Sequence, residues 1–149
     1  MNLSIVIPLY NEDKSIEELN SSIVNVINNM GLIYEIIYID DGSNDSSWRV
    51  IKKIGKKYDH VKGLRFSRNF GKSHALSAGF NQAIGNVIIT LDADLQDDPN
   101  EIPEFYKMID ADSYDLVSGW KKVRYDSLIF KNFPSKIFNW AARKTSGLK

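Results

Sequence analysis

The stretch LSIVIPLYNE at residues 3–12 shows the pattern that decides the fold: a short apolar run passes directly into polar residues. The pattern returns as EIIYIDDGS at residues 35–43 and as NVIITLDAD at residues 86–94. Continuous apolar runs of this length are typical of strands buried on both faces of a parallel sheet. The first run is expected to stop at Pro8, which has no backbone N–H. The expected strands are residues 3–7, 35–39, 61–66, 86–91 and 114–118.

Apolar residues at helical spacing fill the intervals between these strands. They predict a helix after each strand, including one capped by Ser43 or Asn44 and one over residues 73–83 that buries Phe80. A further short helix is expected to open at Pro99. The alternation of strands and helices predicts an α/β fold, a Rossmann-like, doubly wound and mainly parallel sheet with helices on both faces.

The composition narrows the class of protein. The 149 residues suffice for one domain with a sizeable core. There is no cysteine, which excludes disulfides and thiolate metal sites and fits a reducing compartment. No apolar run is long enough to cross a bilayer, and the N-terminus lacks the basic start of a signal peptide. We therefore expect a cytoplasmic location.

The zero net charge conceals a division of the chain. Residues 1–118 hold 11 Lys and Arg against 18 Asp and Glu, whereas residues 119–149 hold 8 basic residues and one acid, Asp126. We expect residues 1–120 to form one domain and residues 121–149 a basic, amphipathic segment that meets phosphate or a membrane surface. A solvated helix face is the alternative for this segment. The acidic remainder argues against nucleic acid as a partner.

Acidic residues follow three of the expected strands. Ligands of open parallel sheets bind at the carboxyl ends of the strands, so these acids are expected to converge there. Like charges held together require a cation or hydrogen-bond donors. The converging acids are Glu12, Asp40, Asp41, Asp92, Asp94 and Asp97.

Asp92 and Asp94 are the pair among them that most specifically indicates a metal site. Residues i and i+2 of an extended segment point the same way, which places both carboxylates beside the amide oxygen of Gln96. This set of hard oxygen ligands suits Mg²⁺ or Mn²⁺, and such an ion keeps positions open for substrate phosphates. The alternative is an acidic turn that caps the following helix, a role also open to Asp97 and Asp98.

Two further groups have two interpretations each. A carboxylate of the pair Asp40-Asp41 can accept a hydrogen bond from a nucleobase or a ribose hydroxyl, or one of the two can simply cap the next helix. Arg68, Asn69 and Lys72 are candidates to face phosphates or a sugar, with structural roles as the alternative.

Four segments, in this order, resemble glycosyltransferase family 2 of the GT-A fold. They are most similar to the branch that transfers sugars onto polyprenyl phosphate, such as dolichol-phosphate mannose synthases. The segments are IVIPLYNE at residues 5–12, IDDGSND at 39–45, RNFGK at 68–72 and DADLQDDP at 92–99. The resemblance covers the chain up to about residue 120, and makes residues 1–120 a nucleotide-sugar-binding GT-A domain truncated before its acceptor half.

The resemblance implies roles for residues that would hold the nucleotide. Pro8, Tyr10 and Glu12 would line it, and Asp41 would contact the base. In relatives an arginine two residues after a glycine reaches the donor diphosphate. Lys121 stands at that position here, and it keeps the charge without the bidentate fork.

The resemblance also implies the metal site. Asp92 would contact the donor and share the metal, while Asp94 and Gln96 would ligate Mg²⁺ or Mn²⁺. Asp92 and Asp94 would thus position donor and metal during catalysis. The catalytic base is expected outside this chain, so the chain alone is expected to bind donor and to turn over weakly.

The implied activity is transfer of a sugar, with inversion, from a nucleoside diphosphate sugar to a polyprenyl phosphate. A UDP-sugar is favoured as donor and GDP-mannose is compatible. The basic segment would hold the enzyme at the inner face of the cell membrane, in cell-envelope biogenesis. The alternatives are transfer to a saccharide hydroxyl in cell-surface polysaccharide synthesis, and a non-catalytic nucleotide-binding module.

Overall fold

The computed structural model of the chain describes residues 1–111 and 114–119. Met1–Val117 form one compact unit, which contains every described helix and strand. The predicted basic segment at residues 121–149, with Lys121, lies outside the described residues. The division of the chain at residue 120 therefore stays a prediction.

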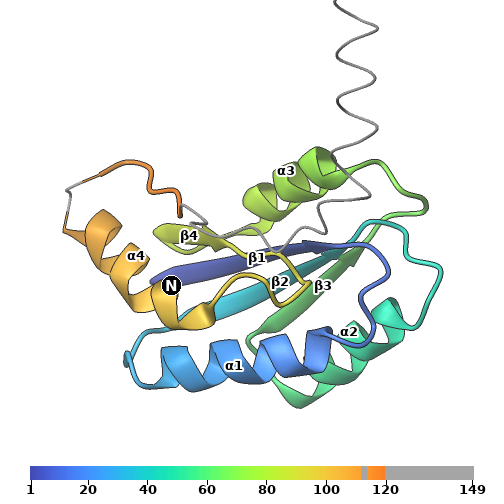
Figure 1. The fold of residues 1–149 in the computed structure, drawn as a ribbon, viewed down its shortest axis with the longest axis horizontal. Coiled ribbons are helices and arrows are strands. Elements are labelled where there is room, and N and C mark those ends of the chain that lie inside the picture. The colour runs from blue at the N-terminus through green and yellow to red at the C-terminus, as the bar shows by residue number, and fades with distance from the viewer. Residues whose placement is uncertain (112–113, 120–149) are drawn as a thin grey trace, which may run out of the picture. The chain divides into compact units, whose positions relative to one another are not determined.

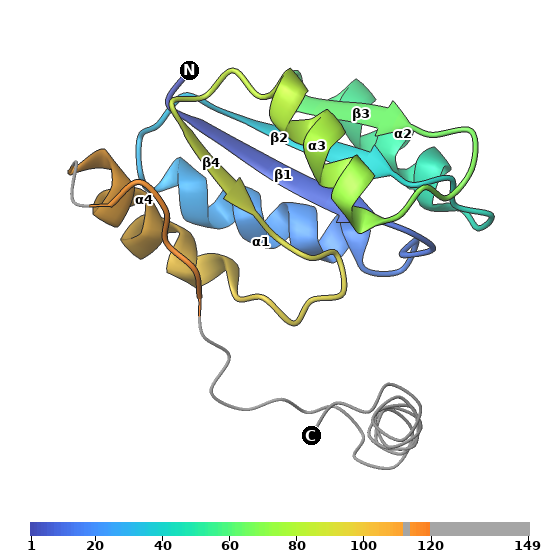
Figure 2. The same ribbon diagram turned by 90° about the horizontal axis from the view of Figure 1, so that it is seen from above.

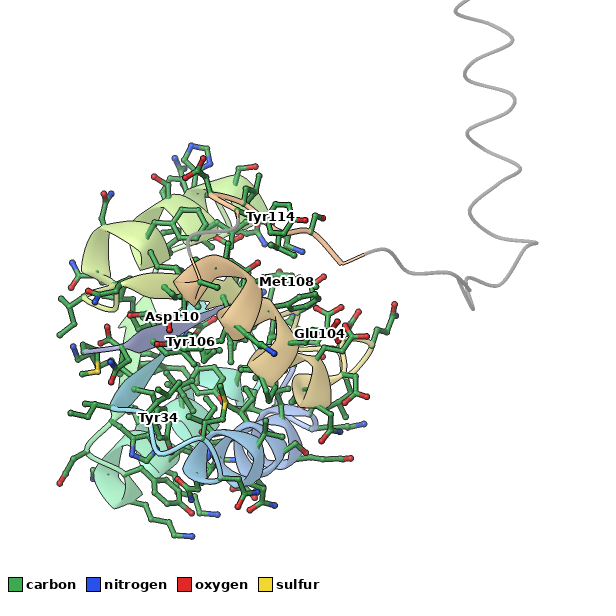
Figure 3. All side chains as sticks on the ribbon, turned by 90° about the vertical axis from the view of Figure 1, so that its left-hand side faces the viewer. Tyr34, Glu104, Tyr106, Met108, Asp110 and Tyr114 are labelled. Atoms are coloured by element: carbon green, nitrogen blue, oxygen red, sulfur yellow. The ribbon has the colours of Figure 1, made fainter. Side chains whose placement is uncertain are left out.

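The described residues form a parallel sheet with helices on both faces, as the sequence predicts (Figure 1). The four strands lie in the order β3-β2-β1-β4, and β1 pairs with both β2 and β4. Helices α1 and α2 cover one face and α3 covers the other, while α4 lies beside α1 near β4 (Figures 2 and 3). No helix in the described part of the chain is long and apolar enough to cross a membrane. In chain order the elements are β1 (Leu3–Leu9), α1 (Ile16–Asn28), β2 (Tyr34–Asp40), α2 (Ser47–Lys57), β3 (Val61–Arg65), α3 (Lys72–Gln82), β4 (Val87–Thr90), a 3-10 turn (Pro99–Glu101) and α4 (Ile102–Asp110).

Successive side chains of β1 point to opposite faces of the sheet and contribute to two separate core clusters. Leu3, Ile5 and Ile7 pack with α1 on one face, whereas Val6 packs with α3 on the other. Helix α3 approaches the sheet closely because it turns small residues toward it. A Cβ atom at Gly79 would lie 2.4 Å from Cγ1 of Val6.

Strand β1 does not stop at Pro8 as predicted, but continues to Leu9. The N–H of Asp41 donates to the carbonyl of Leu9 on the β2 side, so the nitrogen of Pro8 faces the β4 side. The β4 ladder ends where Val6 pairs with Thr90. The missing N–H of Pro8 therefore ends the ladder with β4 but removes no hydrogen bond to β2, so β1 continues beside β2 to Leu9.

The predicted fifth strand at residues 114–118 is wrong. These residues pair with no strand among those described, and the side chain of Leu116 is 84% exposed. Only Leu116 and Val117 are aliphatic in this run, and Asp115 and Ser118 flank them. Pairing so short an apolar run would bury little surface in return for its ordering.

Two details of the predicted helices are also wrong. Phe80 is half-exposed, because α3 turns Ala75 and Gly79 toward the sheet instead. Helix α2 begins at Ser47 rather than after Ser43 or Asn44, and Oδ1 of Asp45 accepts the N–H of Ser47 at 2.8 Å.

Candidate functional site

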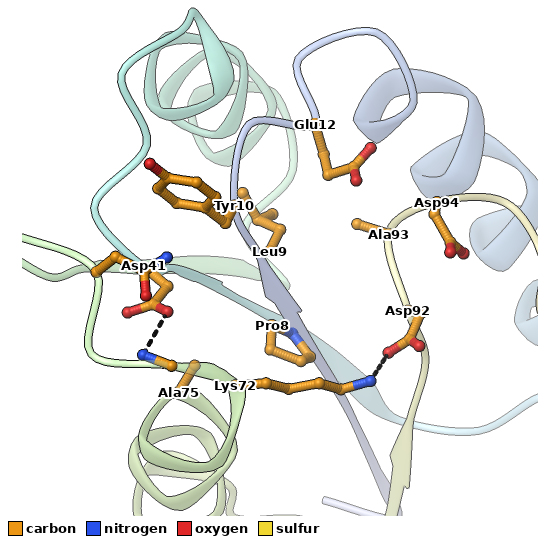
Figure 4. A pocket seen from close by; sticks show the side chains of 12 residues that line it. Pro8, Leu9, Tyr10, Glu12, Asp41, Lys72, Ala75, Asp92, Ala93 and Asp94 are labelled. Atoms are coloured by element: carbon orange, nitrogen blue, oxygen red, sulfur yellow. Dashed lines mark hydrogen bonds and ion pairs between the residues drawn. The ribbon is translucent and has the colours of Figure 1, made fainter. Parts of the chain in front are cut away.

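A cavity of about 360 Å³ opens at the carboxyl ends of β1, β2 and β4 (Figure 4). It brings six of the predicted site residues together: Pro8, Tyr10, Glu12, Asp41, Asp92 and Asp94. Gln96 does not line it, and Lys121 lies outside the described residues. Asn69 and Lys72, whose roles the sequence left open, also line it, whereas Arg68 does not, and the other lining residues are Leu9, Gly71, Ala75 and Ala93.

The segment after β1 carries two of the lining side chains. Tyr10 is 41% exposed at the rim, and its hydroxyl accepts a hydrogen bond from Nδ2 of Asn44 at 3.3 Å. Glu12 faces the same cavity from the next turn of the chain (Figure 4). Between them Asn11 adopts a positive φ of 59°, a conformation that asparagine tolerates better than most residues.

Asp41 connects the end of β2 to the loop before α3, which forms another side of the cavity. Its side chain is buried, and its two oxygens accept the N–H groups of Phe70 and Gly71, each at 2.8 Å. Gly42 has a φ of 75°, and a Cβ atom there would lie 2.4 Å from the carbonyl carbon of Arg68. The β2 end and the loop before α3 are therefore in backbone contact. Each oxygen of Asp41 still has a lone pair for a ligand donor.

Asp40 is not a cavity residue, which corrects the expected convergence of six acids. It is fully buried, and Oδ1 accepts the N–H of Ser43 at 2.8 Å while Oδ2 pairs with Nε of Arg65 at 3.2 Å. Asp97 does not line the cavity either, and its Oδ2 accepts the N–H of Asp92 at 2.9 Å. Both carboxylates support the site from outside it.

Lys72 places a positive charge inside the acidic cavity. Its side chain extends beneath Pro8 and forms an ion pair with Oδ1 of Asp92 (Figure 4). The sequence left the role of Lys72 open, and the ion pair joins the start of α3 to the end of β4. The apolar wall residues Leu9, Ala75 and Ala93 were missed, because nothing in their side chains distinguishes them from core residues.

The residues present fit a hard cation held by few protein ligands. Asp94 is exposed at the cavity, and its Oδ1 accepts the N–H of Gln96 at 3.1 Å. Nowhere in residues 1–111 and 114–119 do three acidic or histidine groups gather to cage a metal. One oxygen of Asp92 is occupied by Lys72. Mg²⁺ and Mn²⁺ accept such sites when phosphates and water complete the coordination shell.

Comparison with known sequences identifies the family. The family model described as Glycosyl transferase family 2 matches residues 4–148. An undecaprenyl-phosphate 4-deoxy-4-formamido-L-arabinose transferase of Shewanella sediminis is 40% identical over 99% of this chain and 44% of its own length. The protein of that name from Salmonella typhimurium is 40% identical over 97% of this chain, again 44% of its own length. The chain thus spans less than half of the curated relatives it matches.

Solved structures share the fold at lower identity. Staphylococcus aureus TarS 1–349 in complex with UDP-GlcNAc matches 88% of this chain and 38% of its own, with a TM-score of 0.63 and 23% identity. Glucosyl-3-phosphoglycerate synthase from Mycobacterium tuberculosis, with Mn²⁺, UDP and phosphoglyceric acid, matches 72% and 38%, with a TM-score of 0.59 and 23% identity. The mannosyltransferase PcManGT from Pyrobaculum calidifontis, with GDP-Man and Mn²⁺, matches 62% and 27%, with a TM-score of 0.53 and 22% identity.

Proposed function

The chain belongs to glycosyl transferase family 2 and has the GT-A fold, and from this premise we propose that its cavity binds the nucleotide of a nucleoside diphosphate sugar. The observation that carries the proposal is the meeting of Tyr10, Asp41 and Asp94 around one cavity at the carboxyl edge of the sheet. That edge is where open α/β sheets bind their ligands. A cavity of about 360 Å³ lies within the usual size of a small-molecule site.

The base and ribose occupy the side of the cavity formed by Tyr10 and Asp41. The ring of Tyr10 and the ring of Pro8 offer apolar surface to a flat base. Asp41 accepts a base N–H or a ribose hydroxyl through the lone pairs that the N–H groups of Phe70 and Gly71 leave open. A UDP-sugar is the favoured donor, with a GDP-sugar as the alternative, because neighbours of this fold are solved with each.

The diphosphate occupies the opposite side, between Asp92 and Asp94. Asp94 would hold Mg²⁺ or Mn²⁺, with Asp92 beside it and Gln96 on the same turn. Such an ion would supply positive charge against the departing diphosphate. Lys72 adds a second positive charge at this end of the cavity, and its ion pair with Asp92 keeps its amine there before the donor binds.

The acceptor is a polyprenyl phosphate, as the names of the relatives from Shewanella sediminis and Salmonella typhimurium suggest. One of its phosphate oxygens attacks the anomeric carbon, the bond to the nucleoside diphosphate breaks, and the configuration inverts. Because the phosphate is already anionic, the attack needs no strong base. The basic residues at 121–149 hold the protein at the inner face of the cell membrane, where such an acceptor resides.

A thermal-shift titration tests the donor site. UDP, GDP, CDP and ADP are each added with and without Mn²⁺ to wild type, Asp94→Ala and Asp98→Ala. Asp98 is the matched control, because it lies on the same segment outside the cavity and caps the 3-10 turn. We expect one nucleotide to raise the Tm only with Mn²⁺, by the equivalent of about 2.7 kcal/mol at a hundred times its Kd.

The shift should persist in Asp98→Ala and disappear in Asp94→Ala. An equal Mn²⁺-dependent shift in Asp94→Ala would contradict the metal role of Asp94. Absence of any shift in wild type, with every nucleotide, would contradict donor binding itself.

A further inference from the structure

The segment after β1 is held almost entirely by side chains of the segment after β2. Three successive backbone N–H groups of the first segment each donate to a different side chain of the second. The pairs are Asn11 with Oγ of Ser43 at 2.9 Å, Glu12 with Oγ of Ser47 at 2.8 Å, and Asp13 with Oδ2 of Asp45 at 3.2 Å.

The acceptors themselves are fixed in place. Ser43 and Ser47 are buried, and neither lines the cavity. The N–H of Ser43 donates to Asp40, and its carbonyl accepts Nη2 of Arg65 at 3.0 Å. The N–H of Ser47 donates to Oδ1 of Asp45 at 2.8 Å, so the backbones of both serines are held beside the β1 segment.

Asp45 is fixed from two sides. Burial alone would raise the pKa of its carboxyl group, but hydrogen bonds from Ser47 and from the N–H of Asp13 outweigh burial and lower that pKa. The carboxylate form therefore predominates at neutral pH, and its two oxygens tie the start of α2 to the β1 segment.

The same contact orients the two cavity side chains. Oδ1 of Asn11 accepts the N–H of Asn44 at 2.9 Å, and Nδ2 of Asn44 donates to the hydroxyl of Tyr10. On the other side, Oγ of Ser15 contacts both the carbonyl and Oε2 of Glu12, at 3.0 and 3.2 Å. Displacing the backbone between Tyr10 and Glu12 would therefore move both groups relative to the cavity.

We propose that Ser43 and Ser47 are positioning residues that set donor affinity through Tyr10 and Glu12, although they do not touch the donor. The inference rests on the proposed donor site. Its physical basis is preorganisation, since a loop already held in its binding conformation loses less entropy when the ligand binds. It assigns to the GSNDSS stretch at residues 42–47 a function beyond starting α2.

The first experiment measures the contact without a ligand. Amide hydrogen exchange of Glu12 is compared in wild type, Ser47→Ala and Ser46→Ala. Ser46 is the matched control, because its Oγ accepts Nη2 of Arg49 on α2 and contacts neither cavity segment. We expect exchange at Glu12 to accelerate about tenfold in Ser47→Ala alone, the ratio for loss of one hydrogen bond.

The second experiment measures the Kd of UDP and of GDP with Mn²⁺ by calorimetry, at a temperature where all variants are folded. We expect Ser47→Ala and Ser43→Ala to weaken binding of the preferred nucleotide by about three- to tenfold, with Ser46→Ala unchanged. In a Glu12→Ala background, Ser47→Ala should weaken binding by less than about twofold, because residues that act through one another are not additive.

Each outcome separates the two proposals. If wild type binds neither nucleotide, the donor site and this inference both fail. If wild type binds and Ser47→Ala binds equally well, only the positioning inference fails. It also fails if Ser46→Ala weakens binding as much as Ser47→Ala, or if the effect of Ser47→Ala is undiminished in the Glu12→Ala background, since either result indicates general loss of structure.

Discussion

Replacing Asp41 by Asn tests whether this carboxylate holds the loop before α3. In wild type both oxygens of Asp41 accept a backbone N–H, from Phe70 and from Gly71. The amide of asparagine has the same shape but only one acceptor oxygen. In Asp41→Asn, one of the two N–H groups must therefore face another donor.

The size of the effect follows from these two contacts. A hydrogen bond to a charged group contributes about 1.5–3 kcal/mol, and an unpaired buried donor costs about 1–3 kcal/mol. The bonds to Phe70 and Gly71 are only partly buried, so water relieves some of the loss. We expect the free energy of unfolding to fall by about 2–3 kcal/mol, and the urea midpoint by about 1–2 M.

Urea denaturation followed by tryptophan fluorescence measures the change. Asp98→Asn is the matched control, because Asp98 is exposed and its Oδ1 accepts the N–H of Asn100. Asparagine caps about as well as aspartate, so this control should change little. A loss of unfolding free energy below about 0.5 kcal/mol in Asp41→Asn, with an unchanged m value, would refute the idea that Asp41 holds the loop before α3. Ordinary surface substitutions have effects of that size.

Two further predictions concern the frame of the site. In Gly79→Val, the Cβ atom would meet Cγ1 of Val6 at 2.4 Å and Cδ1 of Ile39 at 2.8 Å, so we expect a loss of about 1–3 kcal/mol in urea denaturation. The exposed substitution Ser77→Val on the same helix is the control, and an equal loss there would contradict the packing argument. Burial would raise the pKa of Glu35, but hydrogen bonds from Lys62, Ser4 and Ile84 outweigh it and hold the pKa below its usual value of 4.5. A carboxyl group with a lowered folded-state pKa contributes stability that is present above pH 4.5 and is lost as the pH falls through the folded value. Wild type should therefore be more stable than Glu35→Gln at pH 7, and the difference should shrink below pH 4.5. Glu104→Gln, which replaces an exposed carboxyl group (Figure 3), is the control. A constant difference between wild type and Glu35→Gln at every pH would contradict the assignment.

The sequence predicted the sheet well because each strand can be recognised from its own short run of residues. Each buried parallel strand must be a continuous apolar run, and each run ends in polar residues at the same edge. This pattern predicted that Glu12, Asp41, Asp92 and Asp94 meet at one edge, and they line one cavity, whereas Asp40 and Asp97, which it also placed there, do not. The failed strand at residues 114–118 is informative for the same reason, since its run holds only two adjacent aliphatic residues.

What the sequence did not predict depends on neighbours far along the chain. Whether Pro8 ends β1 is decided by which neighbouring strand its nitrogen faces, and both neighbours, β2 and β4, come later in the chain. The ion pair of Lys72 with Asp92 joins the start of α3 to the segment after β4. The distance in space between these two elements cannot be read from any local sequence pattern. The hydrogen bonds of Ser43 and Ser47 are of the same kind, because serine in a turn most often caps its own helix.

The paired aspartates Asp40 and Asp41 show how the site manages its charge. Consecutive residues at a strand end point in opposite directions, so Asp40 turns to Arg65 and Asp41 turns to the backbone of Phe70 and Gly71. The two adjacent aspartates therefore do not act as a pair of metal ligands. The charge of each carboxylate is already balanced by hydrogen bonds or an ion pair within the protein.

The remaining acids of the cavity differ in whether a positive charge balances them. Lys72 balances Asp92, whereas in the part of the chain that the structure describes no ion pair reaches Glu12 or Asp94. Uncompensated charge thus remains on the two sides of one opening, at the end away from Asp41 (Figure 4). A divalent cation brought in with a diphosphate would gain most there, because like charges held together raise the affinity for an opposite charge between them. The electrostatics and the exposed position of Asp94 therefore favour the same end of the cavity for the metal.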